Sequence, residues 1–446
     1  MADITSVIKR SGAVVPFNPE RITNAIYRAA VAVGGRDRAI AEALTVQVIS
    51  LLQANHPPGY MPNIEEIQDA VEKVLIENGH ASVAKAYILY RDERSRLRQG
   101  KASQGGRLSE SIPWKKIWYA LDWAIDHGVH TISGLNRRIA AGELGEVITA
   151  SEAAYHGDID QAVDAIAAWR QQLKLILISG PSSSGKTTTT IKLSQRLARM
   201  GMKLVTLNVD RYFFDLEEHP KDEFGDYDFE TPQALDLDLI DEHLRRLVAG
   251  ERVMIPNYDF KTGQRELNHT PMQVAEDEVI LIDSLHGLYP DMTRSVPDEQ
   301  KFKVYLEPLL QMKDETGNFI RWTDIRLMRR MLRDASFRAY DPTKTLEHWH
   351  YVRSSEMRHI IPHVMECDAI INSAMPYELS LYKPALFPQF SSWVDIYRDD
   401  PLRQDAFERA LRCHHVLSRI VATPDQAVVP VDSVLREFIG GSVYNY

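Results

Sequence analysis

The sequence predicts an α/β fold, a P-loop type of doubly wound and mostly parallel sheet, preceded by a small, mainly helical α+β domain and a helical connector. Short apolar runs that suit buried strands alternate with helical patterns from residue 173 onward. One of these strands leads through a glycine-rich loop directly into a helix. Before residue 172 the apolar residues follow mostly helical spacing, which predicts that the N-terminal domain and the connector are mainly helical.

Composition indicates a globular protein of two or three domains, because 446 residues are 44% apolar and 26% charged. The two cysteines, Cys367 and Cys413, cannot form a disulfide framework or a four-cysteine zinc site. The N-terminus shows no basic-then-apolar signal, and no run of 18 apolar residues occurs. We therefore expect a soluble cytoplasmic protein without a membrane partner.

Charge argues against a nucleic-acid partner, because the formal net charge is −10. Residues 209–241 contain twelve acidic residues and only two basic ones, Arg211 and Lys221. We interpret most of these carboxylates as a solvated acidic loop. A few of them, near the glycine-rich loop, are expected to serve a metal ion or a substrate.

The first region, residues 4–97, is predicted to form a small α+β domain. Residues 6–17 suit two short strands around a Ser-Gly turn, and Pro19 suits the first turn of a helix. Asn63 suits the N-cap of a helix that reaches about residue 78, and another helix is expected over about 82–96.

The second region, residues 98–172, opens with a Gly- and Ser-containing stretch and then follows helical patterns. Trp114, Trp118 and Trp123 have near-helical spacing, which predicts packing rather than a stacking platform. We assign no chemistry to this connector.

The third region, residues 173–390, is predicted to form the sheet, and the helix-rich segment 391–446 closes the chain. Its expected strands and helices are, in order, 173–178 (strand), 188–200 (helix), 203–209 (strand), 238–247 (helix), 279–282 (strand) and 301–306 (strand). Gly180, Asp210 and Asp283 each follow a strand. In doubly wound sheets ligands bind at the carboxyl ends of strands, so we expect these three residues to share one site.

The loop Gly180-Pro181-Ser182-Ser183-Ser184-Gly185-Lys186-Thr187 reads G-x-x-x-x-G-K-T, the phosphate-cradling P-loop. Its glycines let backbone N–H groups approach phosphate oxygens. Lys186 reaches the outer phosphates, Thr187 suits Mg²⁺, and the following helix adds its positive dipole end. The predicted ATP-binding residues are Gly180, Ser182, Ser183, Ser184, Gly185, Lys186, Thr187 and Thr188.

Two carboxylates complete the chemistry of phosphoryl transfer, for which ATP and Mg²⁺ are the expected cofactors. Asp283 has the position of a Walker-B acid and is expected to hold Mg²⁺ together with Thr187. Asp210 can accept the proton of an attacking hydroxyl.

A predicted helix carries four arginines on one face, at i, i+3, i+4 and i+7, which are Arg326, Arg329, Arg330 and Arg333. This face is either solvated or a lid whose guanidinium groups close on the transferring phosphate. A cluster of four histidines lies farther along, at His348, His350, His359 and His363. It lacks a closed nitrogen and sulfur ligand set, so we interpret these as surface histidines.

From Leu173 to Pro388 the sequence resembles the uridine kinase and phosphoribulokinase family of P-loop kinases, in particular a bacterial uridine kinase-like branch. The matching segments are 180–187, 209–213, 228–236, 255–265, the strand ending at residue 283, the arginine helix, 341–349 and 372–379. The resemblance implies that Asp210 is the catalytic base for a 5′-hydroxyl and that Glu230 and Arg326 hold ribose hydroxyls. It also implies that Tyr258 lies beside the base and that Arg329 is a lid arginine that meets the phosphates. We expect Arg329 and Arg333 to close over the transfer as catalytic residues.

The sequence departs from this pattern at Gly263. In uridine-cytidine kinases a histidine after the Tyr-Asp-Phe segment reads the pyrimidine edge, and Gly263 stands at that position. Because a buried polar contact can supply large discrimination factors, its loss leaves open a purine nucleoside or another hydroxylated metabolite.

The first region resembles the ATP-cone, the nucleotide-sensing module of ribonucleotide reductases and their regulators. The resemblance is carried by residues 7–12, Phe17, 20–22, 67–72 and 82–91. It implies a regulatory nucleotide, ATP or dATP, at four basic positions, which are Lys9, Arg10, Arg21 and Arg91. Cone modules often assemble in pairs or larger sets, so a homo-oligomer is expected.

Together these features predict an ATP- and Mg²⁺-dependent kinase that phosphorylates the 5′-hydroxyl of a nucleoside and is regulated at its cone. One alternative is a kinase for a non-nucleoside metabolite, such as a sugar phosphate or a glycerate derivative. Another is a nucleotide-responsive regulator without turnover.

Overall fold

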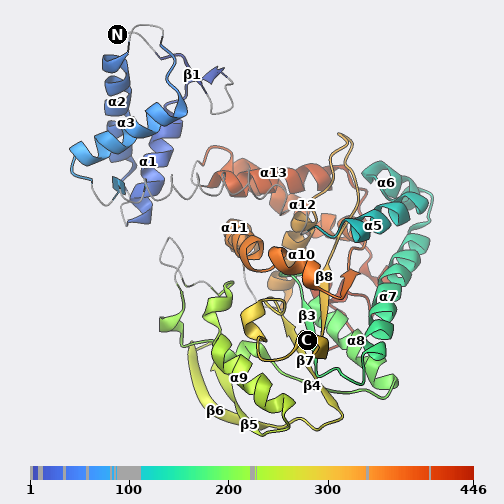
Figure 1. Ribbon diagram of the computed structural model, residues 1–446. Coiled ribbons are helices and arrows are strands. Elements are labelled where there is room, and N and C mark those ends of the chain that lie inside the picture. Colours follow the sequence, from blue (N-terminus) through green and yellow to red (C-terminus); the bar gives the residue numbers. More distant parts are fainter. Residues whose placement is uncertain are drawn as a thin grey trace. The chain divides into compact units, whose positions relative to one another are not determined.

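The computed structural model describes residues 4–8, 14–33, 37–56, 60–80, 83–84, 87, 112–220, 227, 229–337, 341–400 and 403–445 (Figure 1). These residues form two compact units, one within residues 1–107 and one from residue 108 onward. Each unit is described by itself.

The N-terminal unit pairs β1 (Ser6–Ile8) with β2 (Val14–Pro16) in an antiparallel ribbon. Its helices are α1 (Glu20–Ala32), α2 (Arg38–Asn55) and α3 (Ile64–Glu77), which pack around a shared apolar core. Asn63 and Glu66 form the capping box that starts α3, because each side chain accepts from the other residue's backbone N–H. The predicted strand pair is therefore present, and so are the helix predicted to begin near Pro19, which is α1, and the helix predicted to follow Asn63, which is α3. Most of the helix expected over 82–96 lies outside the described residues.

The second unit is built on a five-stranded parallel sheet in the order β4-β7-β3-β8-β9. Its strands are β3 (Leu175–Ser179), β4 (Lys203–Thr206), β7 (Glu278–Ser284), β8 (Lys301–Glu307) and β9 (Ala369–Asn372). Helices α8 (Lys186–Arg199) and α9 (Leu237–Val248) fall where helices were expected. The predicted α/β class with a mostly parallel sheet is confirmed.

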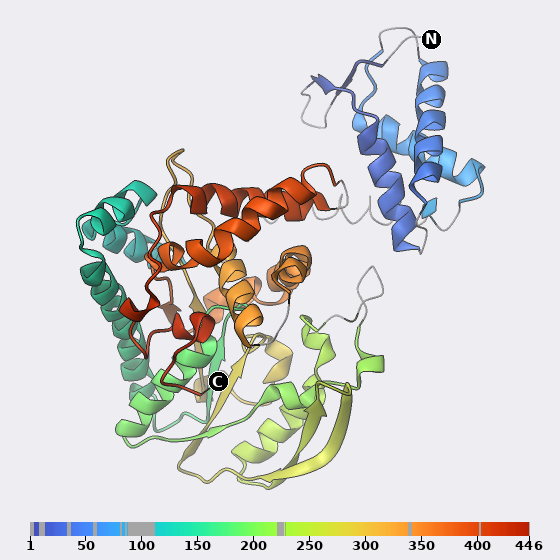
Figure 2. The same cartoon turned by 180° about the vertical axis from the view of Figure 1, so that it is seen from behind.

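An antiparallel hairpin, β5 (Val253–Asp259) and β6 (Gln264–Met272), lies beside α9 at the margin of this unit (Figure 2). Sequence patterns did not predict it, because β6 is polar and largely exposed. Strand β4 is also shorter than expected and ends at Thr206. Asn208 then accepts a hydrogen bond from the backbone N–H of Asp210, and a 3₁₀ turn replaces the end of the expected strand.

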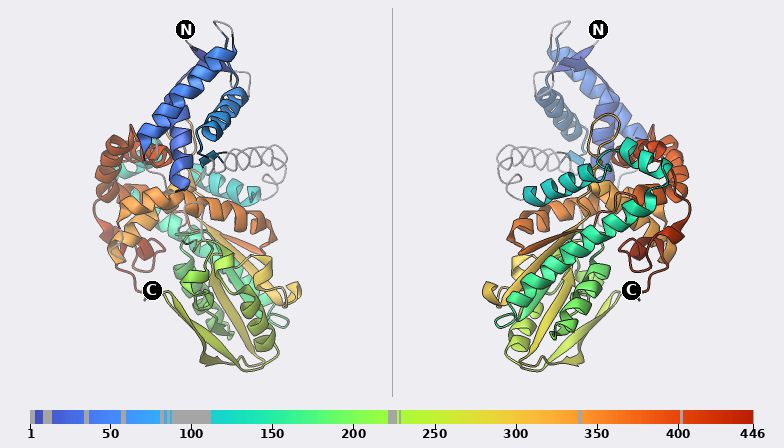
Figure 3. Two further views of the ribbon diagram at one scale, coloured as in Figure 1. Left: turned by 90° about the vertical axis from the view of Figure 1, so that its left-hand side faces the viewer. Right: turned by 90° about the vertical axis from the view of Figure 1, so that its right-hand side faces the viewer.

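Helices α5 (Trp114–Asp126), α6 (Ile132–Ala140) and α7 (Leu144–Ala168) form the region expected as a connector. They share an apolar core with the sheet, and α7 packs along α8 and β9 (Figure 3). The packing prediction for the three tryptophans holds only for Trp123, because Trp114 and Trp118 are exposed.

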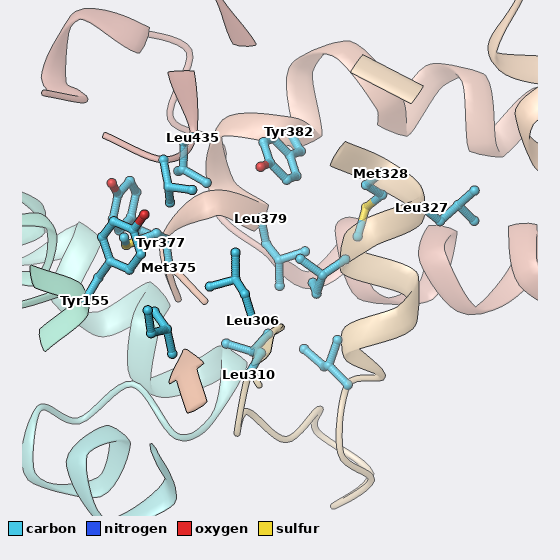
Figure 4. Close-up of a cluster of buried hydrophobic side chains, with 14 of the residues drawn as sticks. Tyr155, Leu306, Leu310, Leu327, Met328, Met375, Tyr377, Leu379, Tyr382 and Leu435 are labelled. Carbon is cyan, nitrogen blue, oxygen red and sulfur yellow. The ribbon is translucent and has the colours of Figure 1, made fainter. Parts of the chain in front are cut away.

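The C-terminal half adds α10 (Trp322–Phe337), α11 (Pro342–His359), α12 (Glu378–Tyr397), α13 (Gln404–Arg419) and the short α14 (Arg436–Ile439). Side chains from α7, β8, α10, α12 and the end of the chain meet in one core, drawn in Figure 4. Tyr155, Leu306, Met328, Tyr382 and Leu435 belong to it, and all five are buried. The C-terminal segment is therefore an integral part of this unit.

Candidate functional site

The glycine-rich loop connects β3 to α8 at the carboxyl edge of the sheet, as its sequence predicted. Gly180 needs its missing side chain, because a Cβ there would lie 2.2 Å from the carbonyl oxygen of Leu306. Gly185 has φ +95°, in the left-handed region that favours glycine. The loop therefore has the tight backbone course that a phosphate cradle requires.

The loop contains polar groups that could bind a ligand. The side-chain hydroxyls of Ser183 and Ser184 are buried without a hydrogen bond in the described structure. The Nζ of Lys186 folds back onto the carbonyl oxygens of Gly180, at 2.9 Å, and Pro181, at 3.3 Å. Burial lowers the pKa of Lys186, and the nearby carboxylates oppose that shift. An anionic ligand with several oxygens would satisfy these donors.

Asp210 and Asp283 both lie close enough to Lys186 to interact with its charge. Asp283 lies in register with Ile178 of β3, at the end of β7, and burial raises the pKa of its carboxyl to about 6. Asp210 lies in the 3₁₀ turn after β4 and stays open to solvent, although the atoms packed around it raise its pKa and Lys186 opposes that shift. The structure thus brings together the three strand-end residues predicted to share a site.

Two side chains beside the loop, those of Thr187 and Asp283, offer oxygen ligands suited to a magnesium ion. Thr187 is exposed at the start of α8, and Asp283 supplies a half-buried carboxylate at the neighbouring strand end. Carboxylate and hydroxyl oxygens suit Mg²⁺, which retains water as its other ligands. The residues present therefore fit the ion, and among the described residues no group of three His, Cys, Asp or Glu side chains forms a different metal site.

The arginine face of α10 is neither a solvated surface nor an open lid at its centre. Arg326 and Arg329 are completely buried. Arg326 pairs with Glu356 and donates to the carbonyl oxygen of Ser182 at 3.0 Å. Arg329 pairs with Glu378 and donates to the carbonyl oxygen of Ser184 at 3.3 Å. Both guanidinium groups thus support the phosphate loop through its backbone carbonyls.

The other two arginines lie at the edge of the site. Arg330 donates to the carboxylate of Glu230 at 3.1 Å and to the hydroxyl of Ser182 at 3.3 Å. Arg333 lies 3.8 Å from the carboxylate of Glu437, near the C-terminus. Sequence reasoning had placed Arg326 beside Glu230, whereas the structure puts Arg330 there. The spacing contained the signal, since Arg330 lies one helical turn beyond Arg326.

Tyr258 belongs to an aromatic cluster beside this edge. The ring of Phe213 lies 5.4 Å from that of Tyr258, and the ring of His219 lies nearly parallel to Tyr258 at 6.0 Å. Phe229 and Phe260 also contact Phe213 and are partly exposed. Planar rings of this kind can stack on a flat aromatic ligand.

Gly263 lies against the start of this cluster. It has φ +72°, and a Cβ there would come within 2.8 Å of the Cβ of Leu216. A histidine is therefore excluded at this position by local packing. His219 supplies an imidazole in the same cluster instead: one nitrogen bonds the carbonyl oxygen of Phe214 at 2.8 Å, and the buried Nδ1 has no hydrogen-bond partner among the described residues. Sequence reasoning missed His219.

The residues assigned to the regulatory nucleotide are only partly described. Arg21 is exposed on α1 of the N-terminal unit. Lys9, Arg10 and Arg91 lie outside the described residues.

Comparison with known proteins separates the two units. Residues 5–96 match the ATP cone domain, and residues 175–379 match the Phosphoribulokinase / Uridine kinase family. A uridine kinase of Chloroflexus aggregans is 29% identical over 176 residues, which are 39% of this chain and 74% of the relative. A vitamin B12-dependent ribonucleoside-diphosphate reductase of Thermoplasma acidophilum is 40% identical over 107 residues, which are 23% of this chain and 13% of that protein.

Among solved structures, a possible uridine kinase from Bacillus stearothermophilus aligns with 16% identity and a TM-score of 0.32, over 49% of this chain and 98% of that one. In the described part of the chain, no helix combines the length and the apolar character needed to cross a membrane. The chain therefore carries an ATP cone domain in residues 5–96 and a phosphoribulokinase/uridine kinase family domain in residues 175–379.

Proposed function

We propose that the protein transfers the γ-phosphoryl group of ATP to the 5′-hydroxyl of a nucleoside, under control of ATP or dATP bound at its cone. One observation carries this proposal above all: Asp210, Asp283 and Lys186 converge beside a phosphate loop with unsatisfied hydroxyls. A carboxylate facing the phosphate site is the group needed to orient and deprotonate an attacking hydroxyl.

Each residue then has a part in the transfer. The loop amides and Lys186 hold the β- and γ-phosphates, and Asp210 takes the proton of the acceptor hydroxyl. Thr187 and Asp283 would hold magnesium, which would neutralise part of the phosphate charge. Arg333 of α10 lies close enough for its charge to act on Lys186, while Arg329 positions the loop through the carbonyl of Ser184.

For the acceptor, we propose a ribose held by Glu230 and Arg330 and a base placed on the aromatic cluster of Tyr258. The Nδ1 of His219, which no described residue contacts by a hydrogen bond, offers an acceptor for an N–H group of that base. A uridine- or cytidine-like acceptor is favoured, with a purine nucleoside as a further candidate.

A non-nucleoside metabolite such as a sugar phosphate or glycerate derivative is the second candidate. It is favoured by Gly263, which removes the base-reading histidine of uridine-cytidine kinases. A nucleotide-responsive regulator without turnover is the third. We place the enzyme in the cytoplasm as a homo-oligomer assembled through its cones.

The test is a screen of nucleosides, sugar phosphates and glycerate for ATP-dependent phosphorylation, with Asp210→Asn beside the parent. We expect nucleoside turnover that falls about 10²- to 10⁴-fold in the variant, whereas Asp291→Asn, at an exposed carboxylate, retains it. Turnover of sugar phosphates or glycerate alone would favour the second candidate. ATP binding without turnover of any acceptor would favour the third.

A further inference from the structure

The last part of the chain returns to the phosphate loop. Residues 430–441, here called the C-terminal strap, lie beside α8 in the second unit (Figure 2). Val434, Leu435 and Phe438 are fully buried and fasten the strap to the core. Arg436 donates to the carbonyl oxygens of four residues around the strap, which are Gln426, Val429, Pro430 and Gly440. The strap therefore holds a defined position.

That position places a carboxylate on the phosphate-binding helix. Oε2 of Glu437 accepts hydrogen bonds from the backbone N–H of Thr188 at 3.1 Å and from its hydroxyl at 2.9 Å. Glu437 is 6% exposed and Thr188 is fully buried. The charge of Glu437 also acts on Lys186 and Asp283, so the carboxylate lies within the electrostatic reach of the site.

The contacted donors are ones that a nucleotide would use. Thr188 is the third residue of α8, and the first four N–H groups of a helix have no partner within it. Such amides bind anions, and those of a P-loop cradle nucleotide phosphates. A carboxylate oxygen and a phosphate oxygen both accept hydrogen bonds, so a phosphate placed here would compete with Glu437 for the same two donors.

The strap also touches the loop itself. A Cβ at Gly185 would lie 2.4 Å from Cγ2 of Val434, so this side chain packs directly on the loop glycine. Two residues earlier in the strap, Asp432 pairs with Lys192 of α8 at 2.9 Å. The loop and the strap are therefore packed against each other, so a change in the position of one should alter the packing of the other.

We propose that Glu437 sets the nucleotide affinity of the phosphate loop: its carboxylate occupies a phosphate position in the nucleotide-free protein, and a bound nucleotide displaces it from Thr188. This inference rests on the proposed function, because it assumes that nucleotide binds at the loop. The displaced carboxylate would then repel the nucleotide phosphates unless the strap moves away. Glu437 thereby weakens binding and couples it to the position of the strap.

The test compares the full-length protein with Glu437→Gln, which keeps the volume but removes the charge, and with Glu299→Gln, an exposed control. Titration calorimetry measures the binding of ATP with Mg²⁺, of ADP and of inorganic tripolyphosphate. We expect Glu437→Gln to bind each at least tenfold more tightly and Glu299→Gln to match the parent. If Glu437→Gln does not fold, Glu437→Asp withdraws the carboxylate by one methylene, and the same gain is expected.

Hydrogen exchange supplies the second measurement. Addition of ADP to the parent should speed the exchange of strap amides, because the contact between Glu437 and Thr188 is lost. Equal or weaker nucleotide binding by both Glu437 variants, or strap exchange that does not rise with ADP, would overturn the inference while nucleotide binding by the parent stands. If neither the parent nor the variants bind nucleotide, both this inference and the nucleotide site of the proposed function are wrong.

Discussion

The guanidinium of Arg326 donates to both carboxylate oxygens of Glu356, at 2.5 and 2.8 Å, in the interior of the second unit. The same guanidinium donates to the carbonyl oxygen of Ser182 in the phosphate loop. Burial acts to raise the pKa of Glu356, but the adjacent guanidinium groups outweigh it and hold that pKa below its usual range. This pair therefore connects α11 to the glycine-rich loop.

Breaking the pair on one side should be costly. Glu356→Ala removes the carboxylate that accepts from both terminal nitrogens of Arg326 and leaves the buried guanidinium with Glu307, 3.4 Å from its Nε, so we expect the free energy of unfolding to fall by about 3–5 kcal/mol. Urea denaturation measures this loss. The double variant Arg326→Met with Glu356→Leu should recover part of that stability, because the bidentate pair is removed as a whole, while Glu307 loses the guanidinium 3.4 Å away. It should bind ATP more weakly, because the carbonyl oxygen of Ser182 loses its donor. A double variant as unstable as the single one would contradict this account.

In the proposed function, Arg330 and Glu230 hold the acceptor. Arg330→Ala removes a charged donor, for which we expect the KM for the acceptor to rise about 10- to 100-fold, in keeping with the strength of charge-assisted hydrogen bonds. The KM for ATP should change little. Steady-state kinetics with each substrate varied in turn measures both, and Arg358→Ala, at an exposed position of α11, is the control. A rise confined to the KM for ATP would place Arg330 on the nucleotide side.

Arg326 and Arg330 show what sequence patterns can predict and what they cannot. The order of strand, loop and helix identified the phosphate loop, because glycine and lysine positions there are dictated by local backbone geometry. Helical spacing correctly placed Arg326 and Arg330 on one face of α10. Spacing cannot tell which arginine on a face is buried, since that depends on acids such as Glu356, which lies thirty residues away in sequence.

The same limit explains the residues that the sequence did not reveal. Glu437 reaches the loop from 249 residues away, and no motif surrounds it. His219 lies in the acidic stretch that was interpreted as a solvated loop, but the rings of Phe213 and Tyr258 bury it. Long-range contacts of this kind follow from tertiary packing alone.

His219 provides a prediction about the base. Its bond to the carbonyl of Phe214 fixes one nitrogen as the donor, which leaves Nδ1 as an acceptor. His219→Phe should raise the KM for the nucleoside about 3- to 10-fold, the range expected for one neutral hydrogen bond. In the proposed contact, an N–H group of the base donates to Nδ1. A nucleoside in which this N–H is methylated should bind the parent and the variant equally. His269→Phe, on the exposed hairpin, serves as the control, and equal KM values for the parent and His219→Phe would exclude the contact.

The cone should act on rate without taking part in the transfer. Lys9→Ala combined with Arg10→Ala removes two positive charges from the proposed effector site. We expect turnover without effector to stay the same, while the response to added ATP or dATP disappears, because a coupling free energy requires effector binding. Initial rates across an effector titration measure this, with Lys73→Ala on α3 as the control. A response that persists unchanged would contradict the regulatory assignment.

His286 makes the second unit sensitive to acid. It is 4% exposed, and burial, aided by the nearby His359, lowers the pKa of its imidazole to about 3. Below the ordinary pKa of 6.5, the unfolded chain binds a proton that the folded protein does not. Stability supplied by the neutral ring is therefore complete above pH 6.5 and declines as the pH falls toward 3, by about 1.4 kcal/mol per pH unit.

Between pH 6.5 and pH 5, His286 alone should therefore remove about 2 kcal/mol from the free energy of unfolding. His286→Gln keeps a donor for the carbonyl oxygen of Glu230, which the imidazole contacts at 3.0 Å, but cannot take up a proton. Urea denaturation at both pH values should show a smaller loss for this variant than for the parent. His348→Gln changes an exposed histidine and should retain the loss of the parent. If His286→Gln and the parent lost equal stability, the acid sensitivity would have to arise from other groups.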